Sequence, residues 1–72
     1  MDIINIPITL QQINVFLTAA KYGNFTKASE ELHMSQSSVS RNIVFIEDAL
    51  GIILFVRFKK RVRLTSAGEY LS

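Results

Sequence analysis

The chain has 72 residues, no cysteine, one histidine and a formal net charge of +2. This length predicts one small domain, and the lack of cysteine excludes disulfides and thiolate metal sites as a source of stability. Because His33 stands alone, a zinc cluster is excluded too, and we expect no metal and no cofactor. The apolar content of 49% is high for so small a domain and suggests that some apolar surface meets another chain or a further domain.

No apolar run is long enough to span a membrane, and no segment resembles a cleavable signal. We therefore expect no membrane partner, and a cysteine-free chain of this kind fits a reducing cytoplasm.

The basic residues are unevenly distributed along the chain. Five of the eight fall in one seven-residue window that contains no acid: Arg57, Lys59, Lys60, Arg61 and Arg63. Such a cluster favours a polyanionic partner, although a solvated charged hairpin would have the same composition.

Residues 1–8 carry four isoleucines and a proline without helical spacing, which predicts an extended amino-terminal arm. A first helix is then expected over residues 9–22. Thr9 and Gln12 have the spacing of a capping box, and Gly23 suits the left-handed conformation that ends a helix. The apolar face is predicted from residues that recur at three- and four-residue steps: Leu10, Ile13, Phe16, Leu17 and Ala20.

Two further helices follow, separated by a very short turn. Asn24 or Thr26 can cap the second, which ends near His33. Phe25, Ala28 and Leu32 share one of its faces. Met34 and Ser35 form the turn, and Ser35 can cap a third helix over residues 36–50. Its buried stripe is predicted from the spacing of four residues, before Gly51 ends the helix: Val39, Ile43, Ile46 and Leu50.

The pattern changes after Gly51. Residues 52–58 are rich in β-branched and aromatic side chains, which predicts a strand, and residues 61–64 alternate charged and apolar side chains as a half-exposed return strand does. Lys59 and Lys60 would form the tip. Thr65 or Ser66 can cap a fourth helix, and Ser66 with Glu69 offers a second capping box.

These elements predict a mainly α fold, a winged helix-turn-helix. It comprises a three-helix core, a two-stranded β wing and the start of a carboxy-terminal linker helix. The expected divisions are an arm over residues 1–8, the winged domain over residues 9–64, and a truncated linker helix over residues 65–72.

The helix-turn-helix unit places its second helix in the major groove of DNA. At the start of that helix, Gln36 can pair with adenine and Arg41 with guanine, while Ser37 and Ser40 suit bases. Ser35 and Ser38 are expected at phosphates, near the free amides of the helix start. Serines also favour helix starts for local reasons, so the serine cluster alone does not decide between capping and DNA contact.

The wing is expected to contact phosphates or the minor groove through four basic residues: Lys59, Lys60, Arg61 and Arg63. A solubilising hairpin is the alternative. An enzyme is not expected, because no glycine-flanked nucleophile is present and His33 stands at a helix end, where capping or packing suffices to explain it.

From Leu10 to Gly68 the chain resembles the amino-terminal winged helix-turn-helix domain of LysR-type transcriptional regulators. The matching stretches are Asn24-Phe25-Thr26-Lys27-Ala28, Leu32-His33, Ser35-Gln36, Ser40-Arg41 with Ile43, Glu47, Leu50-Gly51, Leu54-Phe55 with Arg57, Arg61-Val62-Arg63-Leu64-Thr65, and Ala67-Gly68.

This resemblance implies a bacterial, cytoplasmic regulator that binds double-stranded DNA as a homodimer or within a tetramer. It implies a small-molecule effector only in a carboxy-terminal domain that this sequence does not contain. Base contacts carry over to Gln36, Ser37, Ser40 and Arg41. Thr26 and Arg57 carry over as phosphate contacts.

Three departures from the family pattern concern the third helix. Ser37 stands where the family very often has proline. Val44 and Phe45 stand where polar or basic residues are usual. They would suit a thymine methyl group or burial against a partner.

We therefore expect sequence-specific binding of duplex DNA for transcriptional regulation, with residues 36–50 in the major groove. The rival hypothesis is a protein-interaction module that uses Phe45 and the isoleucine-rich arm.

Overall fold

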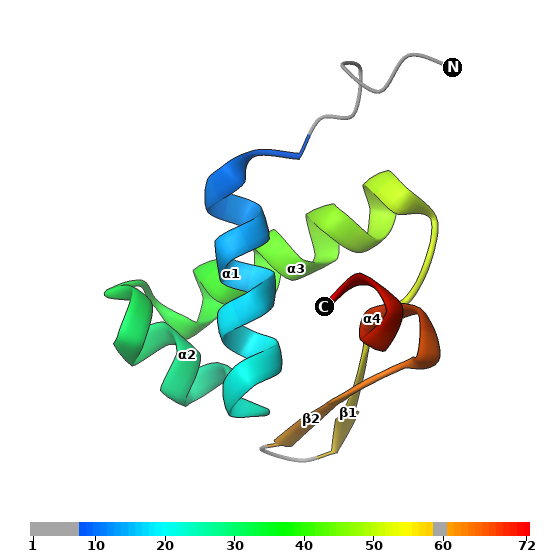
Figure 1. Ribbon diagram of the computed structural model, residues 1–72. Coiled ribbons are helices and arrows are strands. Elements are labelled where there is room, and N and C mark those ends of the chain that lie inside the picture. The colour runs from blue at the N-terminus through cyan, green and yellow to red at the C-terminus, as the bar shows by residue number, and fades with distance from the viewer. Residues whose placement is uncertain (1–7, 59–60) are drawn as a thin grey trace.

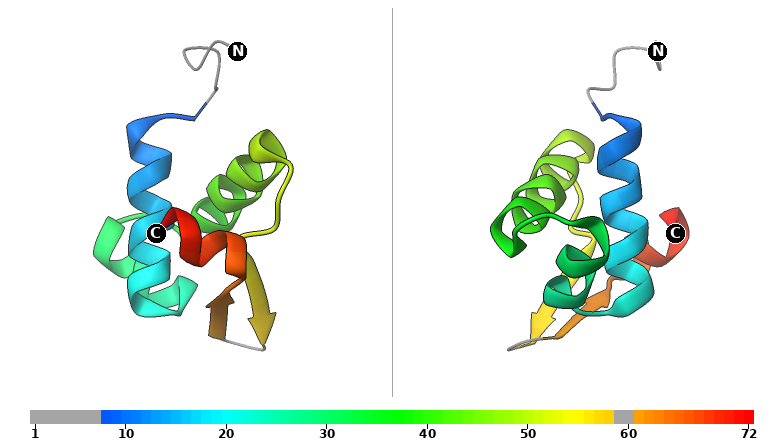
Figure 2. Two further views of the ribbon diagram at one scale, coloured as in Figure 1. Left: turned by 45° about the vertical axis from the view of Figure 1, so that its right-hand side comes forward. Right: turned by 90° about the vertical axis from the view of Figure 1, so that its left-hand side faces the viewer.

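A computed structural model describes residues 8–58 and 61–72 of the chain. The elements follow the order α1 (Leu10–Tyr22), α2 (Phe25–Leu32), α3 (Gln36–Leu50), β1 (Phe55–Phe58), β2 (Arg61–Leu64) and α4 (Ser66–Leu71). The first three helices pack on one another, and the hairpin extends from one end of this group, beside α4 (Figures 1 and 2). This arrangement confirms the predicted winged helix-turn-helix fold. Of the expected arm, residues 1–7 lie outside the described residues.

The core joins the three helices to the wing. Its fully buried side chains include Val15 and Ala19 of α1, Val39 and Ile43 of α3, and Leu54 just before β1. Burial of these apolar groups is the main stabilising contribution in a domain without disulfides. The wing is therefore part of the packed unit.

Three phenylalanine rings connect α1, α2 and β1. Phe55 packs edge-on against Phe16 at 5.7 Å between ring centroids and against Phe25 at 5.6 Å. Edge-to-face pairs at such distances contribute beyond the area that they bury. The first residue of β1 is thereby held against both helices.

The predicted ends of α1 are confirmed, but its predicted buried face is only partly correct, because Phe16 is buried and Ala20 is half-buried against the core while the other members are not. The Thr9 hydroxyl accepts from the Gln12 amide, the Gln12 side chain accepts from the Thr9 amide, and Gly23 closes the helix in the left-handed conformation. The buried residues are Val15, Phe16 and Ala19, whereas three members of the predicted stripe are exposed: Leu10, Ile13 and Leu17. Because α1 carries apolar residues on both sides, spacing alone did not identify the side that faces the core.

The third helix matches its predicted limits. Ser35 caps it by accepting from the Ser38 amide, and Gly51 ends it at φ +69°. Val39, Ile43 and Ile46 are buried as predicted. Leu50 is the exception, because its side chain is 37% exposed in the last turn.

The first strand is shorter than predicted, because residues 52–54 are not part of it. The amides of Leu54, just before the strand, and of Phe55, its first residue, donate to Glu47 Oε2 at 2.8 and 3.2 Å. The Ile53 carbonyl accepts from the Thr65 hydroxyl at 2.6 Å. The return strand Arg61–Leu64 is confirmed and pairs antiparallel with β1.

The fourth helix is capped by Thr65, whose hydroxyl accepts from the Gly68 amide at 3.1 Å. Ser66 is already the first helical residue, so the alternative capping box of Ser66 with Glu69 is wrong. Gly68 is buried where α4 crosses the segment before β1. A Cβ built on it would lie 2.4 Å from the Leu54 carbonyl oxygen.

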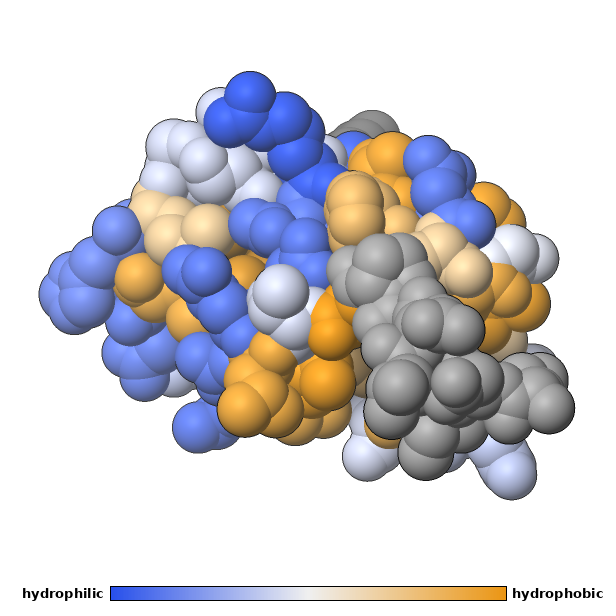
Figure 3. Space-filling view, turned by 90° about the horizontal axis from the view of Figure 1, so that it is seen from above, coloured by the Kyte–Doolittle hydropathy of each residue, from blue (hydrophilic) through white to orange (hydrophobic). Residues whose placement is uncertain are grey.

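Part of the apolar content remains at the surface. Exposed apolar side chains of α1, α3 and α4 include Leu10, Ile13, Leu17, Leu50 and Leu71. An apolar hollow of about 290 Å³ lies between these helices. Viewed from above, apolar atoms reach this side of the molecule in several places, with polar atoms between them (Figure 3).

Gly68→Ala should destabilise the fold by about 1–3 kcal/mol, because the added methyl group meets the Leu54 carbonyl, which is held by a hydrogen bond from the Thr65 amide. Thermal unfolding followed by circular dichroism measures the change. Ser66→Ala, at an exposed position of the same helix, is the control and should shift the free energy of unfolding by less than about 0.5 kcal/mol. Equal stability of the Gly68 and Ser66 variants would contradict this account of the close approach.

Candidate nucleic-acid interface

The turn between α2 and α3 depends on one residue in an unusual conformation. His33 closes α2 at φ +56°, the only non-glycine residue with positive φ in the described part of the chain. The Met34 amide then donates to the Ser29 carbonyl at 3.0 Å. The chain reverses within three residues, and the start of α3 comes to lie against the start of α2.

A bridge between side chains joins these two helix starts. The Thr26 hydroxyl donates to Gln36 Oε1 at 3.2 Å. An amide oxygen has two lone pairs, so Gln36 can still accept from an adenine amino group while its NH₂ donates to the ring nitrogen. Thr26 therefore orients the Gln36 side chain. Since Thr26 has one hydroxyl hydrogen, it cannot donate to Gln36 and to a phosphate at once.

The serines at the start of α3 form a connected group. Ser35 Oγ accepts from the Ser38 amide at 3.0 Å, donates to Ser38 Oγ at 3.0 Å, and lies 3.2 Å from Ser37 Oγ. Arg41 Nη2 donates to Ser38 Oγ at 3.4 Å. Ser38 is thus engaged in local contacts, while the exposed Ser37 hydroxyl and most of the Arg41 donors face solvent.

The outward side of α3 carries the residues predicted for base contact. Gln36, Ser37 and Arg41 are exposed, and Ser40 is half-buried on the same side of the helix. Burial of Val39, Ile43 and Ile46 fixes the rotation of the helix and so directs this polar stripe to solvent.

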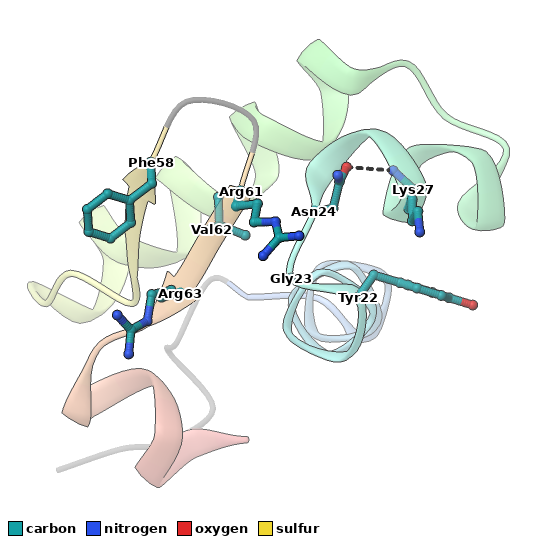
Figure 4. Close-up of a pocket in the computed structure, with 8 residues that line it drawn as sticks. All are labelled: Tyr22, Gly23, Asn24, Lys27, Phe58, Arg61, Val62 and Arg63. Atoms are coloured by element: carbon teal, nitrogen blue, oxygen red, sulfur yellow. Dashed lines mark hydrogen bonds between the residues drawn. The ribbon is translucent and has the colours of Figure 1, made fainter.

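The three wing arginines of the described residues are exposed, but their side chains differ in contacts and direction. Arg57 lies over the Phe25 ring at 5.0 Å from its guanidinium carbon to the ring centroid. This cation–π contact positions the guanidinium beside the start of α2. Arg61 and Arg63 flank the inward-facing Val62 on β2, and Figure 4 shows Arg61 extending toward Asn24 and Arg63 away from it. Lys59 and Lys60, predicted at the tip, lie outside the described residues.

A groove that the sequence did not indicate runs between the wing and the α1–α2 junction. It measures about 620 Å³ and is closed at its base by the Val62 amide donating to the Gly23 carbonyl at 3.1 Å. Its polar and aromatic lining comprises Tyr22, Asn24, Lys27, Phe58, Arg61 and Arg63 (Figure 4). Lys27 is the residue that sequence reasoning missed, because its place opposite Arg61 depends on pairing between distant segments.

Tyr22 keeps its proton at the edge of this groove. Its hydroxyl donates to Glu31 Oε1 at 3.1 Å. That hydrogen bond and the negative charge of Glu31 raise the pKa of Tyr22 above its usual value. A tyrosine is already neutral near pH 7, and this shift keeps Tyr22 neutral at higher pH beside a groove that bears three cationic side chains.

Other kinds of site lack support in the part of the chain that the structure covers. Among residues 8–58 and 61–72, no three histidine or acidic side chains group closely enough to hold a metal ion. None of the helices described is long and apolar enough to cross a membrane.

With this geometry in view, comparison with known proteins identifies the family. Residues 10–69 match the model described as bacterial regulatory helix-turn-helix protein, lysR family. The chain belongs to the LysR family. The chain is 44% identical over 62 residues to the RuBisCO operon transcriptional regulator of Allochromatium vinosum, a match that covers 86% of this chain and 20% of that protein. It is 45% identical over 60 residues to the Hca operon transcriptional activator HcaR of Escherichia coli K12, covering 83% and 20%.

Solved structures of LysR-family proteins have the same fold. The CbnR_DBD–DNA complex aligns with a TM-score of 0.84 at 32% identity, covering 86% of this chain and 71% of that one. The oxidized form of Corynebacterium glutamicum OxyR aligns with a TM-score of 0.88 at 37% identity, covering 93% and 22%. The chain spans about a fifth of the length of the curated relatives it matches.

Ser35→Ala should destabilise this LysR-family domain by about 0.5–2 kcal/mol, because it removes the cap of α3 and leaves the Ser38 amide without its acceptor. In a domain of this size, each kcal/mol lowers the melting temperature by about 4–8 °C. Ser37→Ala is the matched control, since Ser37 caps nothing. A melting temperature unchanged by Ser35→Ala, or lowered equally by both variants, would show that the cap does not stabilise the helix.

Proposed function

We propose that this chain binds double-stranded DNA in a sequence-specific manner and thereby regulates transcription. In this proposal α3 enters the major groove, and the wing contacts the flanking backbone or minor groove. The observation that carries the proposal is the common exposure of a polar stripe on α3 and of arginines on the adjoining wing. An α-helix fits the major groove, and the hydrogen-bonding groups of that stripe match those of base edges.

The proposed base contacts are Gln36, Ser37, Ser40 and Arg41. The proposed backbone or wing contacts are Thr26, Ser35, Ser38, Arg57, Lys59, Lys60, Arg61 and Arg63, to which the groove adds Lys27. Because the Thr26 hydroxyl already donates to Gln36, we assign the Thr26 contact with phosphate to its backbone amide in the first turn of α2.

The names of similar proteins support a function in DNA binding and transcription. Curated proteins similar to this chain are named as regulators or activators of transcription, and one aligned structure is a complex with DNA. We propose on the same basis that the chain is not an enzyme, and that it acts in the bacterial cytoplasm, where the DNA is.

We further propose that the full-length protein acts as a homodimer or tetramer and that any small-molecule effector binds a domain outside this sequence. Support comes from the exposed apolar residues of α1 and α4, including Leu10, Leu17 and Leu71. They belong to other elements than the polar stripe of α3, so covering them would leave that stripe open to DNA.

A salt titration of binding to mixed-sequence duplex DNA tests the proposal. If about four phosphates are neutralised, raising the salt from 50 to 200 mM should weaken binding by about a hundredfold through counterion release. Absence of binding even at 50 mM salt would contradict it.

The same titration on variants separates reading of bases from contact with phosphates. Arg41→Ala should cost about 1–3 kcal/mol at a selected site and much less on mixed DNA, if Arg41 pairs with a guanine. Arg63→Gln should weaken binding to all sequences and reduce the salt slope by about 1. Lys21→Ala removes the same charge from α1 and is the control. Equal losses on selected and mixed DNA for Arg41→Ala would make Arg41 a phosphate contact.

A further inference from the structure

Val44 is an exposed apolar residue in the middle of a polar stripe. Its side chain is 43% exposed, one helical turn after Ser40, and the core of the domain lies on the opposite side of α3. A large part of this apolar group is therefore left in contact with solvent in the described part of the chain. It also breaks a row of residues that otherwise offer hydrogen bonds.

The position of Val44 around the helix coincides with that of the proposed base contacts. At about 100° per residue, Gln36, Ser37, Ser40 and Arg41 spread over one side of α3, and Val44 lies within about 10° of their mean direction. Phe45 has the same exposure, 44%, but lies about 110° from that direction. Only Val44 of this apolar pair continues the stripe.

The stripe has a natural end one turn beyond Val44. Asp48 follows on the same side and is exposed. A carboxylate there would be repelled by phosphates, so we place the end of close DNA contact between Val44 and Asp48. Val44 lies about 6 Å along the axis from Ser40, within the part of the helix that remains in the groove.

We propose that Val44 recognises the C5-methyl group of a thymine, and that it sets the sequence preference at the end of the site read by α3. This inference rests on the proposed DNA binding. A valine side chain offers no hydrogen bond, and the methyl group of thymine is the apolar group that the major groove presents. Burying the two against each other removes apolar surface from water on both sides.

The test uses this chain and a duplex selected from a random pool, in which each thymine is replaced in turn by uracil. The replacement removes one methyl group and keeps every hydrogen-bonding atom. The proposal predicts one thymine at which the replacement weakens binding by about fourfold, the change expected for one methyl group. Val44→Ser should bind the thymine and uracil duplexes equally at that position.

Phe45→Ser is the matched control, because it removes an equally exposed apolar side chain from the same helix. This variant should keep the fourfold preference for thymine. Circular dichroism melting of both variants checks that the fold is retained, as expected for exposed positions.

The remaining outcomes distinguish failure of the proposed role of Val44 from failure of the proposed DNA binding. Equal binding of thymine and uracil duplexes by the unmodified chain, or a preference that persists in Val44→Ser, overturns the role of Val44 and leaves DNA binding standing. Loss of the preference in Phe45→Ser alone assigns the contact to Phe45 and equally overturns it. If the chain binds no duplex at low salt, DNA binding itself fails, and Val44 becomes a candidate for contact with a protein.

Discussion

The carboxylate of Glu47 connects the two parts of the molecule that the proposed function needs together. It leaves α3 in the last turn of the helix and accepts from the amides of Leu54 and Phe55 at 2.8 and 3.2 Å. Hydrogen bonds to an ionised carboxylate are stronger than those between neutral groups. The wing is therefore tied to the far end of the same helix whose near end is proposed to read bases. With the Phe55 ring packed between α1 and α2, this contact sets the distance and angle between helix and wing.

Rigid placement matters because the two elements are proposed to meet one duplex together. The caps of α3, Ser35 and Gly51, set its length, and the buried stripe of Val39, Ile43 and Ile46 sets its rotation. The bridge from Thr26 to Gln36 then orients one of the side chains that we propose to read bases before DNA binds. Groups held in place in this way lose less conformational entropy on binding than free side chains would.

Much of the fold could be predicted from the sequence, because the signals that mark helix ends and turns are local. Capping residues and left-handed glycines act within a few residues of themselves, so the limits of α1 and α3 and the turn at Ser35 were predicted correctly. The errors concern contacts between distant segments. Residues 52–54 are all apolar and two of them, Ile52 and Ile53, are β-branched, but their hydrogen-bonding partners, Glu47 and Thr65, keep them out of the strand. The groove beside Lys27 was not predicted, because it forms only when the Val62 amide donates a hydrogen bond to the distant Gly23 carbonyl.

Amide chemical shifts, measured while duplex DNA is added to the isotope-labelled chain, show which surface of the domain meets DNA. We expect the largest changes in α3 from Gln36 to Val44 and along the wing strands, with little change at Leu10, Ile13 and Leu17 on the exposed side of α1. Changes centred on that side of α1, with the amides of α3 unaffected, would contradict the proposed DNA-binding surface.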